Sequence, residues 1–169
     1  MNTLLVHTLH DLLTYNYWAH RRVWAHILAL SEEQFNQPLD YSVGSICEQV
    51  VHTMRSEELL LSRIRGVERP TYTAADFAGR SAIRVAWDEL EERLWQTVRP
   101  MGEAELARPC RYTNSRGDVF EQTVLQLLLQ LVNHGTDHRA QTLAMMHTLG
   151  AATTAHDLLL FYREANAGV

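Results

Sequence analysis

The region from residue 120 to residue 149 carries an apolar stripe at helical spacing, and this stripe constrains the fold more than any other feature of the chain. Its members recur at alternating steps of three and four residues, which is the repeat of one face of an α-helix. A face this apolar predicts a long helix that packs against other elements. The stripe consists of Phe120, Val124, Leu127, Leu131, His134, His138, Gln141, Met145 and Leu149.

Two histidines interrupt this stripe. His134 and His138 are four residues apart, so both imidazoles leave the same side of the helix. In a packed interior each ring needs a partner, because an unsatisfied buried polar group costs about 1–3 kcal/mol. Either hydrogen bonds within the core or one divalent metal ion bound to both rings would explain the pair. The spacing leaves both explanations open, since a metal site requires at least one further ligand.

Three further segments have the length and pattern of long helices. The first covers about residues 4–30. The second begins at the capping sequence Ser45-Ile46-Cys47-Glu48 and continues to about residue 65, and the third covers about residues 79–99. Together with a helix over about residues 121–149, these segments predict an all-α protein. The expected architecture is a four-helix bundle, in which functional sites are built from facing side chains of the core.

Shorter elements are expected between and after these helices. The sequence Ser31-Glu32-Glu33-Gln34 fits a capping box for a short helix or turn. Residues 111–120 predict a small hairpin or irregular segment before the fourth long helix. Thr154 is a candidate cap for a short C-terminal helix over residues 155–164. A chain of 169 residues is expected to form a single domain, residues 1–169.

Composition excludes several classes of function. The net charge of −5 argues against a nucleic-acid or anionic-membrane surface. The chain contains no lysine, which excludes a Schiff-base lysine and a phosphate-loop lysine. No signal peptide or membrane span is apparent, so the expected location is the cytoplasm. The two cysteines lack metal-ligand spacing and do not indicate a secreted disulfide scaffold.

Other polar residues are candidates for a site, but periodicity alone does not assign them. Asn16 and His20 interrupt the apolar stripe of the first helix, where they either line a substrate pocket or bond to neighbouring helices. His52 lies off the main apolar stripe of the second helix, which favours a place at the helix edge or surface. Glu48 could orient His52, although the capping box gives it a better-supported role.

Several segments resemble the DinB family, and they occur along the chain in the order expected for that family. Residues 15–22 are similar to its Tyr-Asn-x-Trp-Ala-Asn-x-Arg pattern, and residues 112–117 resemble its Tyr-Thr-Asn-x-x-Gly hairpin. Residues 133–141 are similar to its Asn-His-x-x-x-His-Arg-Gly-Gln signature, and residues 157–164 match its C-terminal segment. His52 follows the capping box at the position of the family's first metal-binding histidine.

The resemblance implies a four-helix bundle in which His52, His134 and His138 bind a divalent metal. It also implies a homodimer, since family members often form one. The chain departs from the family pattern at Gln130, where many members have another histidine outside the assigned ligand set, and at Ala140, which replaces a glycine. His20 replaces a common asparagine, and an extra titratable group in a pocket would alter substrate choice.

The function implied by the resemblance is that of a metal-dependent enzyme acting on a small molecule. Some relatives are thiol-dependent S-transferases or isomerases that use a low-molecular-weight thiol such as bacillithiol or mycothiol. Imidazole ligands suit zinc or nickel, the first candidates, and also iron or cobalt. Glu58, Asp137 and Asn16 are candidate partners that would orient the ligand rings. The alternatives are a metal-dependent hydrolase, a non-enzymatic metal-binding stress-response protein, and a structural protein without metal.

Overall fold

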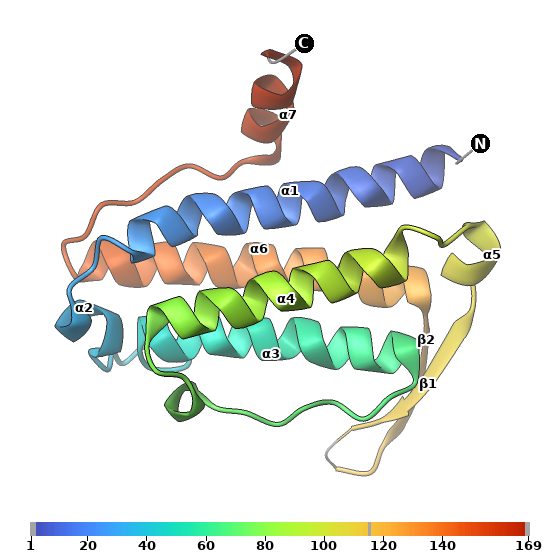
Figure 1. Cartoon of the computed structure of the whole chain (residues 1–169), viewed down its shortest axis with the longest axis horizontal. Coiled ribbons are helices and arrows are strands. Elements are labelled where there is room, and N and C mark those ends of the chain that lie inside the picture. The colour runs from blue at the N-terminus through green and yellow to red at the C-terminus, as the bar shows by residue number, and fades with distance from the viewer. Residues whose placement is uncertain (1–2, 115, 168–169) are drawn as a thin grey trace.

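Four long helices lie side by side and form most of the structure (Figure 1). The computed structural model describes residues 3–114 and 116–167. The long helices are α1 (Leu4–Ile27), α3 (Ile46–Arg65), α4 (Arg80–Val98) and α6 (Val124–Thr148). Helix α6 packs against both α1 and α3, and α3 also packs against α4. The prediction of a mostly helical protein with four long helices is therefore confirmed.

Short elements connect the long helices or follow them. Strands β1 (Pro109–Thr113) and β2 (Val119–Thr123) form an antiparallel hairpin directly before α6, as the sequence predicted. In its register Tyr112 faces Phe120. The remaining elements are α2 (Glu32–Asn36), the 3₁₀-helix η1 (Ala74–Asp76), α5 (Glu103–Leu106) and α7 (Leu158–Ala167).

Local side-chain chemistry determines where α3 begins and ends. The Ser45 hydroxyl accepts a hydrogen bond from the Glu48 backbone N–H, and the Glu48 carboxylate accepts one from the Ser45 backbone N–H. This reciprocal arrangement satisfies two donors that the first turn of a helix leaves free. The helix stops at Gly66, whose φ of 65° is left-handed. Both capping boxes expected from the sequence, at Ser31 and Ser45, are present.

Three predicted boundaries were wrong. Phe120 belongs to β2 rather than to the long helix, because Thr123 caps α6 and the helix begins at Val124. Helix α1 ends at Ile27, three residues earlier than expected. The last helix begins at Leu158 instead of residue 155, because the preceding backbone is irregular and hydrogen-bonded to side chains of α1. There the carbonyls of residues 155 and 156 accept hydrogen bonds from α1 side chains, Arg22 and Tyr15 respectively.

The core lies between the long helices. Four apolar members of the α6 stripe are buried, namely Val124, Leu127, Leu131 and Met145, while Leu149 at its end is half-buried. Each of the four buried side chains is at most 3% exposed, so this face of α6 is a packing surface as the periodicity predicted. No helix within residues 3–114 and 116–167 combines the length and apolar character needed to cross a bilayer.

Helices α1 and α6 approach each other closely at Gly135. A methyl group at this position would collide with Oδ1 of Asn16 and lie 3.0 Å from Nη1 of Arg139. A glycine inside a helix is usually a weak point, since alanine is favoured there by about 1 kcal/mol. The close packing of α1 and α6 therefore accounts for glycine at position 135, because there is room for a hydrogen atom but not for a methyl group.

We expect Gly135→Ala to lower the free energy of unfolding by about 1–3 kcal/mol, because overpacking outweighs the gain in helix propensity. Urea denaturation measures the change. In an Asn16→Ala background the same substitution is expected to cost less, since the colliding group is gone. A stabilised Gly135→Ala protein would contradict the close approach of α1 and α6.

Candidate metal centre

Three imidazoles from two helices converge on one point. His52 comes from α3, and His134 and His138 come from α6. One ring nitrogen from each residue lies within 4.8 Å of the other two. Nitrogens that share a tetrahedral zinc ion are about 3.4 Å apart, given Zn–N bonds of about 2.0–2.1 Å. Small side-chain rotations would therefore close the three rings around a cation.

The position of His52 was the least certain of the three from periodicity. It lies beside the main buried stripe of α3, at the edge where α3 meets α6. Its ring centroid lies 4.6 Å from that of His138 and 5.5 Å from that of His134. The structure therefore brings together all three residues that the family resemblance implied, including the one that spacing alone would have left at the surface.

The surroundings of the three rings keep them neutral. Burial lowers the pKa of all three histidines below the usual value, and it is reinforced by the charge of Arg55 at His52 and by repulsion from His52 at His134. The effect is largest at His138, where burial and then repulsion from the two other rings lower the pKa to about 4. Only a neutral imidazole has a lone pair for a metal, so the cluster is poised to coordinate one.

Gln49 orients one of these rings and was not expected from the sequence. Its fully buried amide lies 2.8 Å from Nδ1 of His138 and 3.1 Å from Oε1 of Gln141. If the amide nitrogen donates to Nδ1, the ring proton of His138 lies on Nε2. Nε2 can bind a metal in the other tautomer, in which the proton is on Nδ1 and the amide oxygen of Gln49, not its nitrogen, is its partner. A hydrogen bond on the distal nitrogen is the usual way in which a ligand ring is held in place. The only signal in the sequence was a polar residue one turn before His52.

The partners that we expected for the ligand rings lie elsewhere. Glu58 pairs with Arg93 of α4 at 2.7 Å, and Asn16 accepts a hydrogen bond from Arg139. Asp137 is exposed and accepts a hydrogen bond from Gln141, although its charge opposes the lowering of the pKa at His134 and His138. None of the three forms a hydrogen bond to His52, His134 or His138 among the contacts of the described residues.

Two grooves flank the three histidines. The first, of about 490 Å³, runs between α3, α6 and the hairpin and has His134 in its wall. Its base contains apolar residues such as Leu60 and Leu127, and three glutamines add amide groups. The second, of about 400 Å³, lies on the other side, between α3 and η1, and has His52 and Glu48 in its wall. A small molecule could thus approach the three rings from either side.

Comparison with known proteins decides the family. The sequence model described as the DinB family matches residues 1–168. The chain belongs to the DinB family. It is 25% identical over 158 residues to Protein DinB of Bacillus subtilis (strain 168), an alignment that covers 89% of this chain and 91% of that protein.

A solved structure shows a similar fold. The crystal structure of a conserved protein from Enterococcus faecalis superposes with a TM-score of 0.63 at 11% sequence identity. The match covers 79% of this chain and 92% of that protein. At this level of identity the likeness concerns the fold alone.

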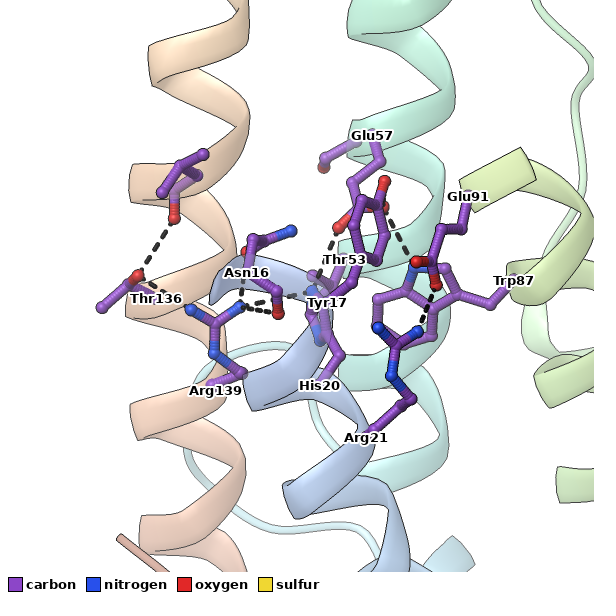
Figure 2. A network of polar contacts seen from close by, with 12 residues as sticks. Asn16, Tyr17, His20, Arg21, Thr53, Glu57, Trp87, Glu91, Thr136 and Arg139 are labelled. Carbon is purple, nitrogen blue, oxygen red and sulfur yellow. Dashed lines mark hydrogen bonds and ion pairs between the residues drawn. The ribbon is translucent and has the colours of Figure 1, made fainter. Parts of the chain in front are cut away.

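Asn16 and His20, the two polar residues on the first helix of this DinB-family chain, belong to an interior network (Figure 2). Asn16 is fully buried and His20 is 6% exposed. Nη1 of Arg139 donates to Oδ1 of Asn16 at 2.6 Å, and Nη2 of Arg139 donates to the Thr136 hydroxyl at 2.9 Å. Both residues bond to neighbouring helices, and neither lines a groove beside the three histidines, although His20 lines a small cavity of about 10 Å³. A substrate pocket at Asn16 and His20 stays a prediction.

Glu57 is the acceptor at the centre of this network. Its buried carboxylate accepts hydrogen bonds from the Tyr17 hydroxyl at 3.2 Å and the Trp87 indole at 3.0 Å, and lies 3.1 Å from Nε2 of His20 (Figure 2). A carboxylate can only accept, so the Nε2 proton of His20 faces Glu57. Burial alone would raise the pKa of Glu57, but these donors outweigh it and the pKa lies below its ordinary value. Glu57 therefore stays charged, and its charge acts through space on the buried guanidinium of Arg139, which lies 3.3 Å from Nε2 of His20.

We expect Glu57→Gln to lower the free energy of unfolding by about 2–4 kcal/mol. The amide cannot accept from all three donors, and Arg139 loses the negative charge that balances it. Asp88→Asn is the control, because Asp88 forms only a surface ion pair with Arg84, worth about 0–1 kcal/mol. Equal effects of the two substitutions, measured by urea denaturation, would contradict a special role for Glu57.

His20 makes stability depend on pH. Burial, reinforced by the charge of Arg139, lowers the pKa of His20 from 6.5 to about 4. Between these values the unfolded chain binds a proton that the folded protein does not bind, so the free energy of unfolding falls as the pH falls from 6.5 toward 4. The contribution amounts to about 3 kcal/mol across this window.

We expect His20→Gln to reduce this dependence, because glutamine keeps a donor for Glu57 but does not titrate. Part of the dependence should remain, since the pKa of His138 is lowered to about 4 as well. Urea denaturation at pH 7, 6 and 5 compares the variant with the wild type and with His7→Gln, an exposed histidine of the same helix. If the free energy of unfolding changes with pH equally in His20→Gln and in the wild type, His20 does not cause the pH dependence.

Proposed function

We propose that this chain is a metal-dependent enzyme in which His52, His134 and His138 hold a divalent transition metal within a four-helix bundle. The observation that carries the proposal is the convergence of three neutral imidazoles, with nitrogens within 4.8 Å of one another, beside a groove of about 490 Å³. Three imidazole ligands leave at least one position for water or substrate, which is the pattern of a catalytic rather than a structural zinc site. Zinc and nickel are the first candidates.

A metal bound here would lower the pKa of a coordinated thiol or water. The chain's own residues supply the positioning. Gln49 fixes the ring of His138, and the groove that reaches His134 holds the substrate next to the open side of the three rings. The apolar base of this groove excludes water from part of the substrate.

Thiol transfer or isomerisation suits this site better than hydrolysis. Among the described residues that line the two grooves, Glu48 is the only acidic one, and its Oε2 already accepts from the backbone and hydroxyl of Ser45. A metal-bound hydroxide and a metal-bound thiolate are both nucleophiles, but hydrolysis generally also needs a free acid–base group that delivers a proton to the leaving group. A thiol-dependent S-transferase or isomerase acting on a small molecule is therefore our favoured reaction class. A homodimer without nucleic-acid partners stays a prediction.

We expect the purified protein to bind about one equivalent of Co²⁺, Ni²⁺ or Zn²⁺. Alanine at position 52, 134 or 138 should weaken binding at least about 100-fold, because even changes behind the ligands cost 10–100-fold. Calorimetry measures the affinity, and the d–d absorption of Co²⁺ reports the coordination. His147→Ala is the matched control, because His147 is exposed on the same helix as two of the proposed ligands.

Unchanged affinity in all three variants would contradict the metal centre. If the metal binds but a panel of thiols and electrophiles gives no turnover, the protein is a metal-binding protein without catalytic function. Metal binding should also raise stability, by about 2.7 kcal/mol when the free metal is at 100 times its dissociation constant.

A further inference from the structure

The groove beside His134 contains an arginine without a charge partner. Arg63, in the last turn of α3, lies in the wall of this groove together with Tyr112 of the hairpin. Its guanidinium carbon lies 3.6 Å from the centre of the Tyr112 ring, so the group is stacked against an aromatic face. Within the part of the chain that the structure describes, Arg63 forms no ion pair with a carboxylate.

The neighbourhood of Arg63 is positively charged although the whole chain is acidic. Arg63 and Tyr112 also line an adjoining groove of about 480 Å³, whose wall includes Arg69 and Arg111. Glu68 lies in the same wall but forms no ion pair with Arg63 among the described contacts. Burial, followed by repulsion from Arg69, lowers the pKa of Arg63, while Tyr112 opposes this shift. A partly buried, stacked and unpaired guanidinium is a preorganised receptor for a planar anion.

A second group in this groove lacks a partner. Oε1 of Gln122, on β2, is buried and accepts no hydrogen bond within the described structure. Gln126 and Gln130 line the same groove from α6. Because this oxygen is covered in the structure, an N–H or hydroxyl of a bound molecule would reach it only after the Gln122 side chain rotates, and leaving it unpaired costs about 1–3 kcal/mol.

The antiparallel packing of α3 and α6 determines how far Arg63 lies from the three histidines. Residues near the start of α3 contact the later part of α6, as the hydrogen bond between Gln49 and His138 shows. Arg63 lies further along α3, close to the hairpin that precedes α6. The eleven residues from His52 to Arg63 correspond to about 16 Å along α3 at a rise of about 1.5 Å per residue, so Arg63 lies on the order of 15 Å or more from the three rings.

We propose that Arg63, held flat against Tyr112, binds a carboxylate of the substrate or thiol cosubstrate at the end of the groove remote from the three histidines. The inference rests on the proposed function and restricts the expected ligands of that site to elongated, anionic molecules. Such a ligand carries its reacting atom at the metal and its carboxylate on the order of 15 Å or more away, with polar groups between them facing the glutamines Gln126 and Gln130 of the groove wall.

The test uses Co²⁺-loaded protein and ω-mercapto acids paired with the corresponding amides. The probes are 3-mercaptopropionic, 8-mercaptooctanoic and 11-mercaptoundecanoic acid, together with their amides. The thiolate-to-Co²⁺ absorption band reports binding at the metal. We expect the longer acids to bind on the order of tenfold more tightly than their amides, because a charge-assisted hydrogen bond forms, and the short acid to show no preference.

Substitutions assign the preference to one side chain. Arg63→Gln should abolish the preference for the acid, and Arg63→Lys should retain only part of it, since lysine lacks the planar fork. Arg65→Gln is the matched control, because Arg65 is exposed two residues away on the same helix. The preference should also weaken as salt is raised. Equal binding of acid and amide in the wild type, or an unchanged preference in Arg63→Gln, would overturn the proposal.

The two proposals fail in different ways. If no thiol produces the absorption band, the metal-centred function is contradicted, and the Arg63 site is then tested by itself with octanoate and octanamide. Their effect on the NMR signal of the Arg63 Nε–H reports contact without any metal. A shift with octanoate alone supports the carboxylate site, whereas no shift, or equal shifts with both probes, contradicts it.

Discussion

The buried negative charge of Glu57 must be balanced inside the protein, and the groups that balance it come from three other helices. Tyr17 and His20 belong to α1 and Trp87 to α4, and Arg139 of α6 meets this network at Nε2 of His20, 3.3 Å from its Nη1. An unpaired buried charge costs several kcal/mol, so these helices are held in one mutual arrangement. The same arrangement brings His52 of α3 toward α6, where His138 directly precedes Arg139. The buried network around Glu57 thus fixes the relative positions of α3 and α6, the two helices that carry the three histidines.

The contact between α3 and α6 has a buried side, which faces the core, and an accessible side, which faces the grooves. Toward the interior, Glu57 and Arg139 are almost inaccessible to water and their hydrogen bonds are specific. Toward the outside, His52 and His134 are half-buried and grooves lie beside them. The side chains of a functional site must be held rigidly by the residues packed against them and must remain accessible to a ligand. Gln49 joins the two sides, because its amide is buried in the core while it orients His138.

The hairpin contributes an aromatic ring and an amide group to the wall of the groove between α3 and α6. It places Tyr112 against the guanidinium of Arg63 and adds the unpaired oxygen of Gln122. Phe120, predicted to lie on the helical stripe, is stacked instead on Tyr112 across the two strands. The segment between α4 and α6 therefore contributes directly to the wall of the proposed binding site.

The sequence by itself determined the long helices, their caps and the common face of His134 and His138, because these depend on spacing within about one turn of a helix. The sequence also indicates that Glu57 is buried, because Glu57 lies at helical spacing between Met54 and Leu61 in the apolar stripe of α3. Only the tertiary structure decided that His52 faces α6, that Gln49 reaches His138 and that Arg63 stacks on Tyr112. These contacts join residues that are distant along the chain, and the periodicity of one helix carries no information about which neighbour its edge will meet.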